Sequence, residues 1–287
     1  MQRFDFKGDE VAFVRAGAGD PIVFLHNGGT SHAIWRFQIA QLARDHEVFA
    51  LDLPGYGASA RPRDGYTLDT YTDLVEAFVD HQELPPITLV GNCMGSAIAL
   101  NFACRRSADV RCLVLINPLT EATLMRSTIT GALYWLDRKL PLAGRLAGRV
   151  PKLPRWLPAL MTPMLVGTSG RRERTHRNAD LHAALRSEGE MRSLTGLLAD
   201  IPRYRDLDAL QPKQDIPGFP RVCTIWGEQN RVLSADAGRV LNESLRPERA
   251  EWLEQCGHLP MLEEPHRVTD IITSFVHDAD EASEPRA

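Results

Sequence analysis

A series of short, unbroken apolar runs, each bounded by turn residues, limits the possible folds most. These runs are 22–26, 48–53, 87–90, 110–116 and 221–226. A strand that is covered on both faces of a sheet has no side facing water, so its residues are continuously apolar. Helical patterns lie between and after the runs, at 31–43, 69–83, 94–103, 234–245 and 265–277, with a further strand expected at 249–253. This alternation predicts a mostly parallel sheet with helices on both faces.

Two regions depart from the alternation. Residues 2–7 and 10–15 are strand-like and are joined by a Gly8-Asp9 turn, which predicts a hairpin. From about 119 to 210 the chain is rich in Leu, Pro and Arg and has no strand-like run, so we expect a helical insertion over one end of the sheet. The predicted organisation is a core formed by 1–118 and 211–277, a helical lid at 119–210 and a flexible tail at 278–287.

Composition and charge exclude several classes of protein. A chain of 287 residues, 44% hydrophobic and 24% charged, fits one α/β domain, and its net charge of −4 argues against a nucleic-acid binder. The sequence has no run of 18 apolar residues and begins with alternating polar and apolar residues, so we expect a cytoplasmic protein. Its five cysteines are odd in number and include no Cys-x-x-Cys, which predicts free thiols rather than disulfides or a metal site.

The strongest local motif is Gly91-Asn92-Cys93-Met94-Gly95, which follows a predicted strand and opens a predicted helix. Small residues two positions before and after a nucleophile permit a sharp, strained turn that lifts the central side chain clear of the sheet. Taken alone, the pentapeptide is equally consistent with a glycine-bounded turn around a buried cysteine.

Four further motifs extend this pattern along the chain. The pentapeptide resembles the nucleophile elbow of the α/β-hydrolase family, usually Gly-x-Ser-x-Gly, with Cys93 in the serine position. The other motifs resemble that family's oxyanion loop, the loop after its fourth strand, its acid-bearing loop and its histidine loop: Leu25-His26-Asn27-Gly28-Gly29, 52–59, Trp226-Gly227-Glu228-Gln229-Asn230 and Cys256-Gly257-His258. The resemblance implies an α/β-hydrolase fold, with a mostly parallel eight-stranded sheet flanked by helices and a helical lid insertion.

The resemblance also implies a role for each site residue. Cys93 is the expected nucleophile and His258 the expected general base. The backbone N–H groups of Gly28 and Met94 are the expected oxyanion hole, which binds the oxygen that gains charge during attack. Such a reaction needs no cofactor and no metal.

The third catalytic position departs from the family, because Asn230 stands where an aspartate is usual. An amide can accept a hydrogen bond from the ring of His258, but it cannot stabilise the imidazolium by charge. Losing the carboxylate costs a serine enzyme on the order of 10⁴ in rate. A thiol is more acidic, with a pKa of about 8.5, and can rest as a thiolate beside an imidazolium. We therefore expect Cys93 and Asn230 to compensate each other, as in papain-like proteases, which use Cys, His and Asn on another fold.

Glu121 is an alternative acid, because some members of the family place the carboxylate after the sixth strand. That strand is expected to end near 116, and Glu121 follows it by a few residues. The sequence leaves open whether Asn230 or Glu121 supports His258.

The insertion has a lopsided charge. Residues 126–177 contain eleven Lys and Arg but two acids, a net charge of +9, which leaves −13 for the rest of the chain. One interpretation is a solvated lid whose apolar side covers the site. A second is a docking face for an acidic acyl carrier protein or for the phosphates of coenzyme A. A third is contact with an anionic membrane surface through Trp156 and neighbouring leucines.

Taken together, these features predict a hydrolase of an ester, thioester or lactone that works through a Cys93-bound acyl group and accepts an apolar acyl substrate. Dienelactone hydrolases in the family also use cysteine, so a lactone is among the candidate substrates. The alternatives are an acyltransferase or cyclase of secondary metabolism, acting on a carrier-bound chain, and a non-catalytic ligand-binding protein on a hydrolase scaffold. Intercepting the thioester with an amine, hydroxyl or thiol distinguishes transfer from hydrolysis.

Overall fold

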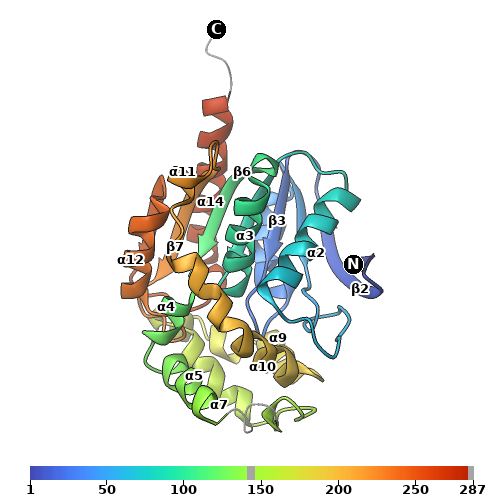
Figure 1. The fold of residues 1–287 in the computed structure, drawn as a ribbon, viewed down its shortest axis with the longest axis vertical. Helices are drawn as coiled ribbons and strands as arrows, with labels where there is room; N and C mark the ends of the chain where they lie inside the picture. The colour runs from blue at the N-terminus through green and yellow to red at the C-terminus, as the bar shows by residue number, and fades with distance from the viewer. Residues whose placement is uncertain (141–145, 284–287) are drawn as a thin grey trace.

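The centre of the protein is a sheet of eight strands, formed within the residues that the computed structural model describes, 1–140 and 146–283 (Figure 1). Their order in the sheet is β1-β2-β4-β3-β5-β6-β7-β8. β2 pairs antiparallel with β1 and β4, and the pairs from β4 through β8 are parallel. This confirms the predicted hairpin and mostly parallel sheet. The strands are β1 (Gln2–Phe6), β2 (Asp9–Ala16), β3 (Pro21–Leu25), β4 (Glu47–Leu51), β5 (Ile87–Asn92), β6 (Val110–Ile116), β7 (Arg221–Gly227) and β8 (Arg249–Leu253).

Helices cover both faces of the sheet. Successive residues of each strand point to opposite sides, so each strand contributes apolar side chains to the core on either face. Val23 of β3 joins the apolar core beneath α2, α3 and α12, whereas its neighbour Ile22 joins the core beneath α1 and α14. Figure 1 shows α2 and α3 side by side in front of the sheet. The helices of the core are η1 (His32–Trp35), α1 (Arg36–Leu42), α2 (Leu68–His81), α3 (Met94–Arg105), η2 (Ser107–Asp109), α11 (Pro212–Asp215), α12 (Ala235–Leu245), α13 (Pro260–Glu263) and α14 (Pro265–Ser283).

The last helix is longer than the sequence predicted. We expected it to end at 277, with a flexible tail at 278–287, but α14 continues to Ser283. The polar composition of this stretch hid its helical propensity, because apolar spacing is the signal that the prediction used. Residues 284–287 lie outside the described part of the chain.

Within the described residues, the segment from 119 to 210 consists of helices joined by loops and contains no strand, and 141–145 lie outside the description. Its leucines lie against Gly28 and Gly29 after β3, and Ser193 lies against Gly55 after β4. The insertion therefore packs over the carboxyl ends of the parallel strands, below the sheet in the view of Figure 1. Its helices are α4 (Glu121–Met125), α5 (Thr130–Lys139), α7 (Leu157–Leu165), α8 (Thr168–Arg172), η3 (Thr175–Arg177), α9 (Ala179–Leu185), α10 (Glu190–Asp200) and η4 (Ile201–Asp208).

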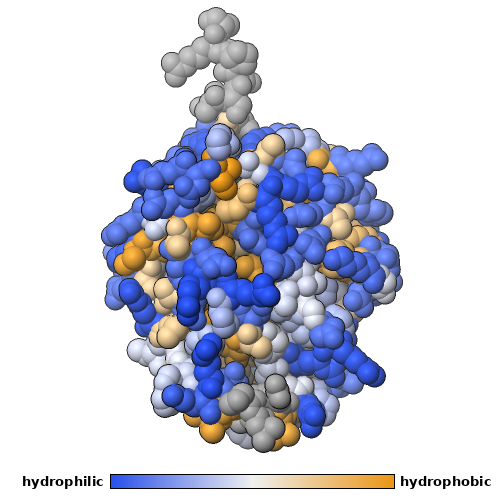
Figure 2. Space-filling view, viewed as in Figure 1, coloured by the Kyte–Doolittle hydropathy of each residue, from blue (hydrophilic) through white to orange (hydrophobic). Residues whose placement is uncertain are grey.

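The outer surface of the insertion is apolar as well as basic. Figure 2 shows apolar side chains among hydrophilic ones at this end of the molecule. No helix among the described residues is both long and apolar enough to cross a membrane. The large apolar side chains exposed on the insertion are Met125, Leu133, Trp135, Leu136, Leu140, Leu146, Val150, Trp156 and Leu160.

Candidate functional site

Cys93 lies at a sharp turn between β5 and α3, as the sequence predicted. Its φ of +53° is a conformation that non-glycine residues rarely adopt. Both flanking glycines are required, because a Cβ at Gly91 would lie 2.3 Å from the Gly95 carbonyl and a Cβ at Gly95 would lie 2.1 Å from the Leu25 oxygen. Strain held by such close packing is a feature of functional sites. The turn therefore has the geometry of a nucleophile elbow.

The loop after β3 is held in place by His26. The His26 ring contacts the Asn27 carbonyl through Nδ1 at 2.8 Å and accepts the Leu53 N–H through Nε2 at 2.9 Å. Because Nε2 is an acceptor, the ring is neutral, and burial lowers its pKa. His26 is thus a brace for the loop that carries Gly28.

The main chain of His258 is fixed by two buried asparagines that the sequence analysis did not single out. The side-chain amides of Asn92 and Asn117 each donate to the His258 carbonyl at 3.3 Å, and the His258 N–H donates to the Leu165 carbonyl at 2.7 Å. Asn92 also donates to the Asn27 side chain at 3.0 Å. Asn92 thus connects the turn at Cys93, the loop after β3 and the loop that carries His258.

Glu263 holds the histidine loop against the insertion. Its buried carboxylate accepts the N–H groups of Gly257 at 2.9 Å, Leu259 at 3.1 Å and Gly167 at 2.7 Å. Burial raises the pKa of Glu263, and these backbone donors oppose that rise. No local sequence pattern reveals this role of Glu263, because it depends on the packing of the insertion against the histidine loop.

Asn230 does not make the hydrogen bond that we predicted. Its side-chain oxygen accepts the backbone N–H groups of Val232 at 2.9 Å and Leu233 at 3.0 Å. The chain turns immediately after Asn230 and leaves these two N–H groups in need of an acceptor, which an Asn side chain commonly supplies. The oxygen that was expected to hold the His258 ring is therefore occupied by the turn.

Two buried side-chain nitrogens on neighbouring loops have no hydrogen-bond partner within the described chain. They are Nδ2 of Asn230 and Nδ1 of His258. The two loops are joined by the Gln229 N–H, which donates to the Cys256 carbonyl at 2.9 Å. Buried polar groups without a partner are costly, so they mark a place where bound substrate, water or a charged intermediate changes the bonding.

Glu121 is engaged elsewhere. The Tyr134 hydroxyl donates to one carboxylate oxygen of Glu121 at 3.2 Å, and Arg205 forms an ion pair with the other. Glu121 therefore connects α4, α5 and η4 within the insertion. Among the residues described, no hydrogen bond joins Glu121 to His258.

The ionisation of the pair also differs from the expected thiolate and imidazolium. Cys93 and His258 are 7% and 2% exposed. Burial raises the pKa of the Cys93 thiol to about 12, although the Met94 N–H, which donates to Cys93, lowers it slightly. Burial lowers the pKa of His258 to about 3. Removing water disfavours both charged forms, so the resting site holds a neutral thiol and a neutral imidazole.

Comparison with known proteins identifies the family to which this geometry belongs. Residues 22–271 match the Alpha/beta hydrolase family. The chain belongs to this family. Its sheet order, its sharp turn at Cys93 and its helical insertion after β6 agree with the resemblance seen in the sequence, and the fold is the α/β-hydrolase fold.

Three similar proteins illustrate the family. The 2-hydroxy-6-oxo-2,4-heptadienoate hydrolase of Pseudomonas putida is 25% identical over 94% of this chain and 93% of its own length. The structure of a thermophilic esterase from Thermogutta terrifontis matches with a TM-score of 0.79 at 20% identity, over 97% of this chain and 99% of the esterase. The enol-lactonase from Burkholderia xenovorans LB400 matches with a TM-score of 0.75 at 18% identity, over 96% and 100% of the two chains.

The surroundings of Gly28 in this α/β hydrolase are mostly apolar. Leu194 and Leu197 of α10 lie 3.4 and 3.1 Å from the position that a Cβ on Gly28 would take, and the Tyr56 hydroxyl lies at 3.3 Å. Tyr56 is fully buried, and burial together with nearby Glu190 and Cys93 raises its pKa well above the usual value. The loop after β3 therefore faces leucine side chains and a buried tyrosine.

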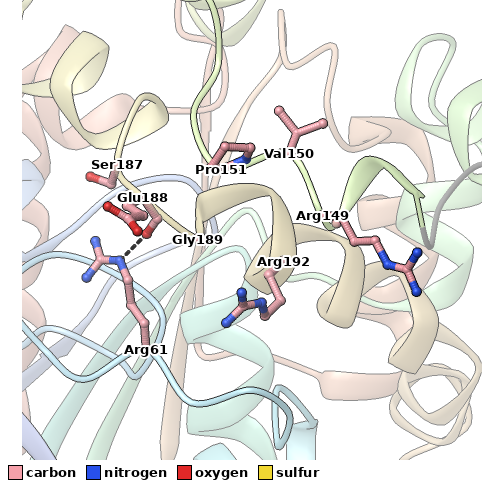
Figure 3. A pocket seen from close by; sticks show the side chains of 9 residues that line it. Arg61, Arg149, Val150, Pro151, Ser187, Glu188, Gly189 and Arg192 are labelled. Carbon is pink, nitrogen blue, oxygen red and sulfur yellow. Dashed lines mark hydrogen bonds between the residues drawn. The ribbon is translucent and has the colours of Figure 1, made fainter.

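A basic pocket of about 540 Å³ opens on the surface beside the first turn of α10 (Figure 3). Arg61, Arg149 and Arg192 contribute to its lining, and Arg61 donates to the Glu188 carbonyl. Arg149 and Arg192 form no ion pair within the described chain. The pocket therefore offers positive charge to an anionic group.

No metal centre is formed by the residues that the structure describes, since it contains no group of three or more His, Cys, Asp or Glu able to hold an ion. The described cysteines are free thiols.

Proposed function

We propose that this α/β hydrolase cleaves an ester, thioester or lactone through an acyl group bound to Cys93. The observation that carries this proposal is the strained turn at Cys93, enforced by Gly91 and Gly95. Strain of this kind in a buried turn costs on the order of 1–3 kcal/mol and serves no purpose for a merely structural cysteine. Its position at the family's nucleophile turn supports a thiol that attacks a carbonyl.

Because Cys93 and His258 are both neutral at rest, the thiol proton moves only during attack on the carbonyl. His258 takes the thiol proton as sulfur forms its bond to the carbonyl carbon, and the carbonyl oxygen becomes an oxyanion. The Met94 and Gly28 N–H groups bind that oxyanion. His258 then gives the proton to the leaving oxygen or sulfur as its bond to carbon breaks. Water attacks the thioester in the same manner, which releases the acid and restores the thiol.

The relatives and the apolar surroundings support an apolar acyl substrate. The relatives include a hydrolase of an oxo-dienoate, an esterase and an enol-lactonase, so esters and lactones are the first substrates to test. Leu185, Leu194 and Leu197 lie beside Gly28 and Gly29, where an acyl chain would extend from Cys93. In this proposal the insertion acts as a lid that excludes bulk water from the intermediate.

Acyl transfer is the second candidate function, and the pocket of Arg61, Arg149 and Arg192 favours it. Three arginines around one pocket suit the phosphates of coenzyme A or the phosphopantetheine of an acidic acyl carrier protein. A carrier held there would deliver its acyl chain toward α10. A thioester on Cys93 retains enough transfer potential to react with an amine, a hydroxyl or another thiol.

A substrate screen tests the proposal. Wild type and Cys93→Ala are incubated with acyl thioesters, activated esters and lactones, with and without an added amine or thiol acceptor, and the products are measured by mass spectrometry. We expect the free acid from wild type and none above background from Cys93→Ala. Transferred product in place of the acid supports the acyltransferase. Equal turnover by both proteins contradicts the cysteine mechanism, and tight binding without turnover by either identifies a ligand-binding protein.

A further inference from the structure

Glu190 is a buried carboxyl group beside the oxyanion loop. It is the first residue of α10 and is 2% exposed. Its Oε1 lies 3.8 Å from the position that a Cβ on Gly29 would take. Within the described chain, that oxygen has no hydrogen-bond partner. A buried carboxyl oxygen without a partner reduces stability, so its presence next to Gly29 requires a reason.

Helix capping does not supply that reason. An acidic residue in the first turn of a helix usually stabilises the N-terminus by its charge. The Glu190 oxygen instead lies against Gly29 and, in the described part of the protein, accepts no N–H of α10. Burial raises the pKa of Glu190 to about 8, so the group is uncharged at neutral pH and carries an O–H.

The groups around Glu190 leave this O–H available. Arg61 lowers the pKa of Glu190 in opposition to burial, but its guanidinium donates to the Gly57 carbonyl at 3.2 Å and to the Glu188 carbonyl. The hydroxyl groups of Tyr66 and Tyr71 donate to the carbonyls of other loop residues. Tyr56 is the third tyrosine whose pKa Glu190 raises, and Cys93 raises the pKa of Tyr56 as well.

We propose that Glu190 is a specificity-determining residue that donates a hydrogen bond to a second oxygen of the acyl group, one or two carbons from the scissile carbonyl. This inference rests on the proposed function, because Gly28 and Gly29 locate the scissile carbonyl. The substrate class is an acyl group with a keto or hydroxyl oxygen near the carbonyl, such as a 3-oxoacyl chain. A plain alkyl chain would leave the buried O–H without a partner, and a site built for a hydrogen bond discriminates against such an analogue.

Glu190→Gln and Glu190→Leu test the inference. Gln keeps a neutral donor at every pH, and Leu keeps the volume without a donor. Glu173→Gln, which changes an exposed acid on the same insertion, is the control. The assay compares kcat/KM for a 3-oxoacyl and a saturated acyl N-acetylcysteamine thioester of equal chain length. We expect wild type to favour the 3-oxoacyl substrate about tenfold or more at pH 7, consistent with one buried hydrogen bond.

The pH dependence separates hydrogen bonding from simple packing. We expect the preference to fall above about pH 8 in wild type and in the control, to persist in Glu190→Gln and to be lost at all pH values in Glu190→Leu. An unchanged preference in Glu190→Leu would overturn the inference. A preference that falls equally with pH in Glu190→Gln would also overturn it.

Binding measurements keep this test independent of catalysis. The same two thioesters are titrated calorimetrically into Cys93→Ala and into Cys93→Ala combined with Glu190→Leu. If Cys93 proves not to be the nucleophile, the binding preference still reports on Glu190. Equal dissociation constants for the two thioesters in Cys93→Ala would contradict the inference and leave the proposed hydrolysis intact.

Discussion

Asn230→Asp replaces the side-chain nitrogen of Asn230 by an oxygen and leaves the shape of the residue unchanged. One carboxylate oxygen can keep the N–H groups of Val232 and Leu233, which lie 2.9 and 3.0 Å from the present amide oxygen. The other replaces a nitrogen that is buried and that the described chain leaves without a partner, as it does Nδ1 of His258. The aspartate can therefore accept a hydrogen bond from the imidazolium that forms during attack.

The size of the effect follows from the energy of such a bond. A hydrogen bond to a charged group contributes about 1.5–3 kcal/mol. At 1.36 kcal/mol for each factor of ten, kcat/KM rises about 10- to 150-fold. The same energy raises the pKa of His258, which burial now lowers to about 3, by about one to two units.

The assay measures kcat/KM with an activated thioester and follows the His258 ring by NMR titration. Gln229→Glu is the control, because it adds the same charge at the exposed neighbouring position, where the side-chain oxygen accepts from Thr168. We expect the control to change neither quantity appreciably. An Asn230→Asp protein with unchanged activity and an unchanged His258 pKa would show that Asn230 does not lie behind the ring, and would refute the reasoning.

Three further perturbations follow from the same geometry. Cys93→Ser should lower kcat/KM by more than about 100-fold, because a hydroxyl needs the missing carboxylate more than a thiol does, and adding Asn230→Asp should restore part of the loss; full activity of the single variant would argue against a thiol-specific site. Gly95→Ala should prevent stable folding, because its Cβ would lie 2.1 Å from the Leu25 oxygen, and a cooperative thermal transition near that of wild type would contradict the close approach. Glu190→Gln should change the pH dependence of the free energy of unfolding. The pKa of Glu190 rises from 4.5 to about 8 on folding, so wild type loses up to about 5 kcal/mol of stability as the pH rises between these values, and the variant does not. Urea-unfolding curves of the two proteins that respond equally to a change from pH 5 to pH 8 would count against a buried neutral carboxyl.

The sequence predicted those features that depend on local pattern. The apolar runs corresponded to strands because both faces of the sheet are covered, and the glycines around Cys93 indicated a turn that the structure contains. The resemblance to the α/β hydrolases located His258 and Asn230 on neighbouring loops. These features could be predicted because each depends on a few consecutive residues.

The features that were missed depend on neighbours far apart in the chain. Asn92 and Glu263 are ordinary polar residues in the sequence, and their roles arise only where the histidine loop meets the oxyanion loop and the insertion. The ionisation of Cys93 was predicted in the wrong direction, because reference pKa values describe a solvated thiol and burial reverses the preference. No sequence motif pointed to Glu190, because its proposed role depends on its short distance from Gly29 in the folded protein.

Intact-mass spectrometry of the reacting enzyme tests the central claim most directly. Wild type and Cys93→Ala are mixed with an acyl thioester, and the reactions are quenched in acid during turnover. The intact mass of each protein is measured, and the protein is then digested to locate the modification. The account predicts an added mass equal to the acyl group on the peptide that contains Cys93, and no such adduct on Cys93→Ala. Turnover without an adduct on Cys93, or an adduct confined to the partly exposed Cys104, would contradict it.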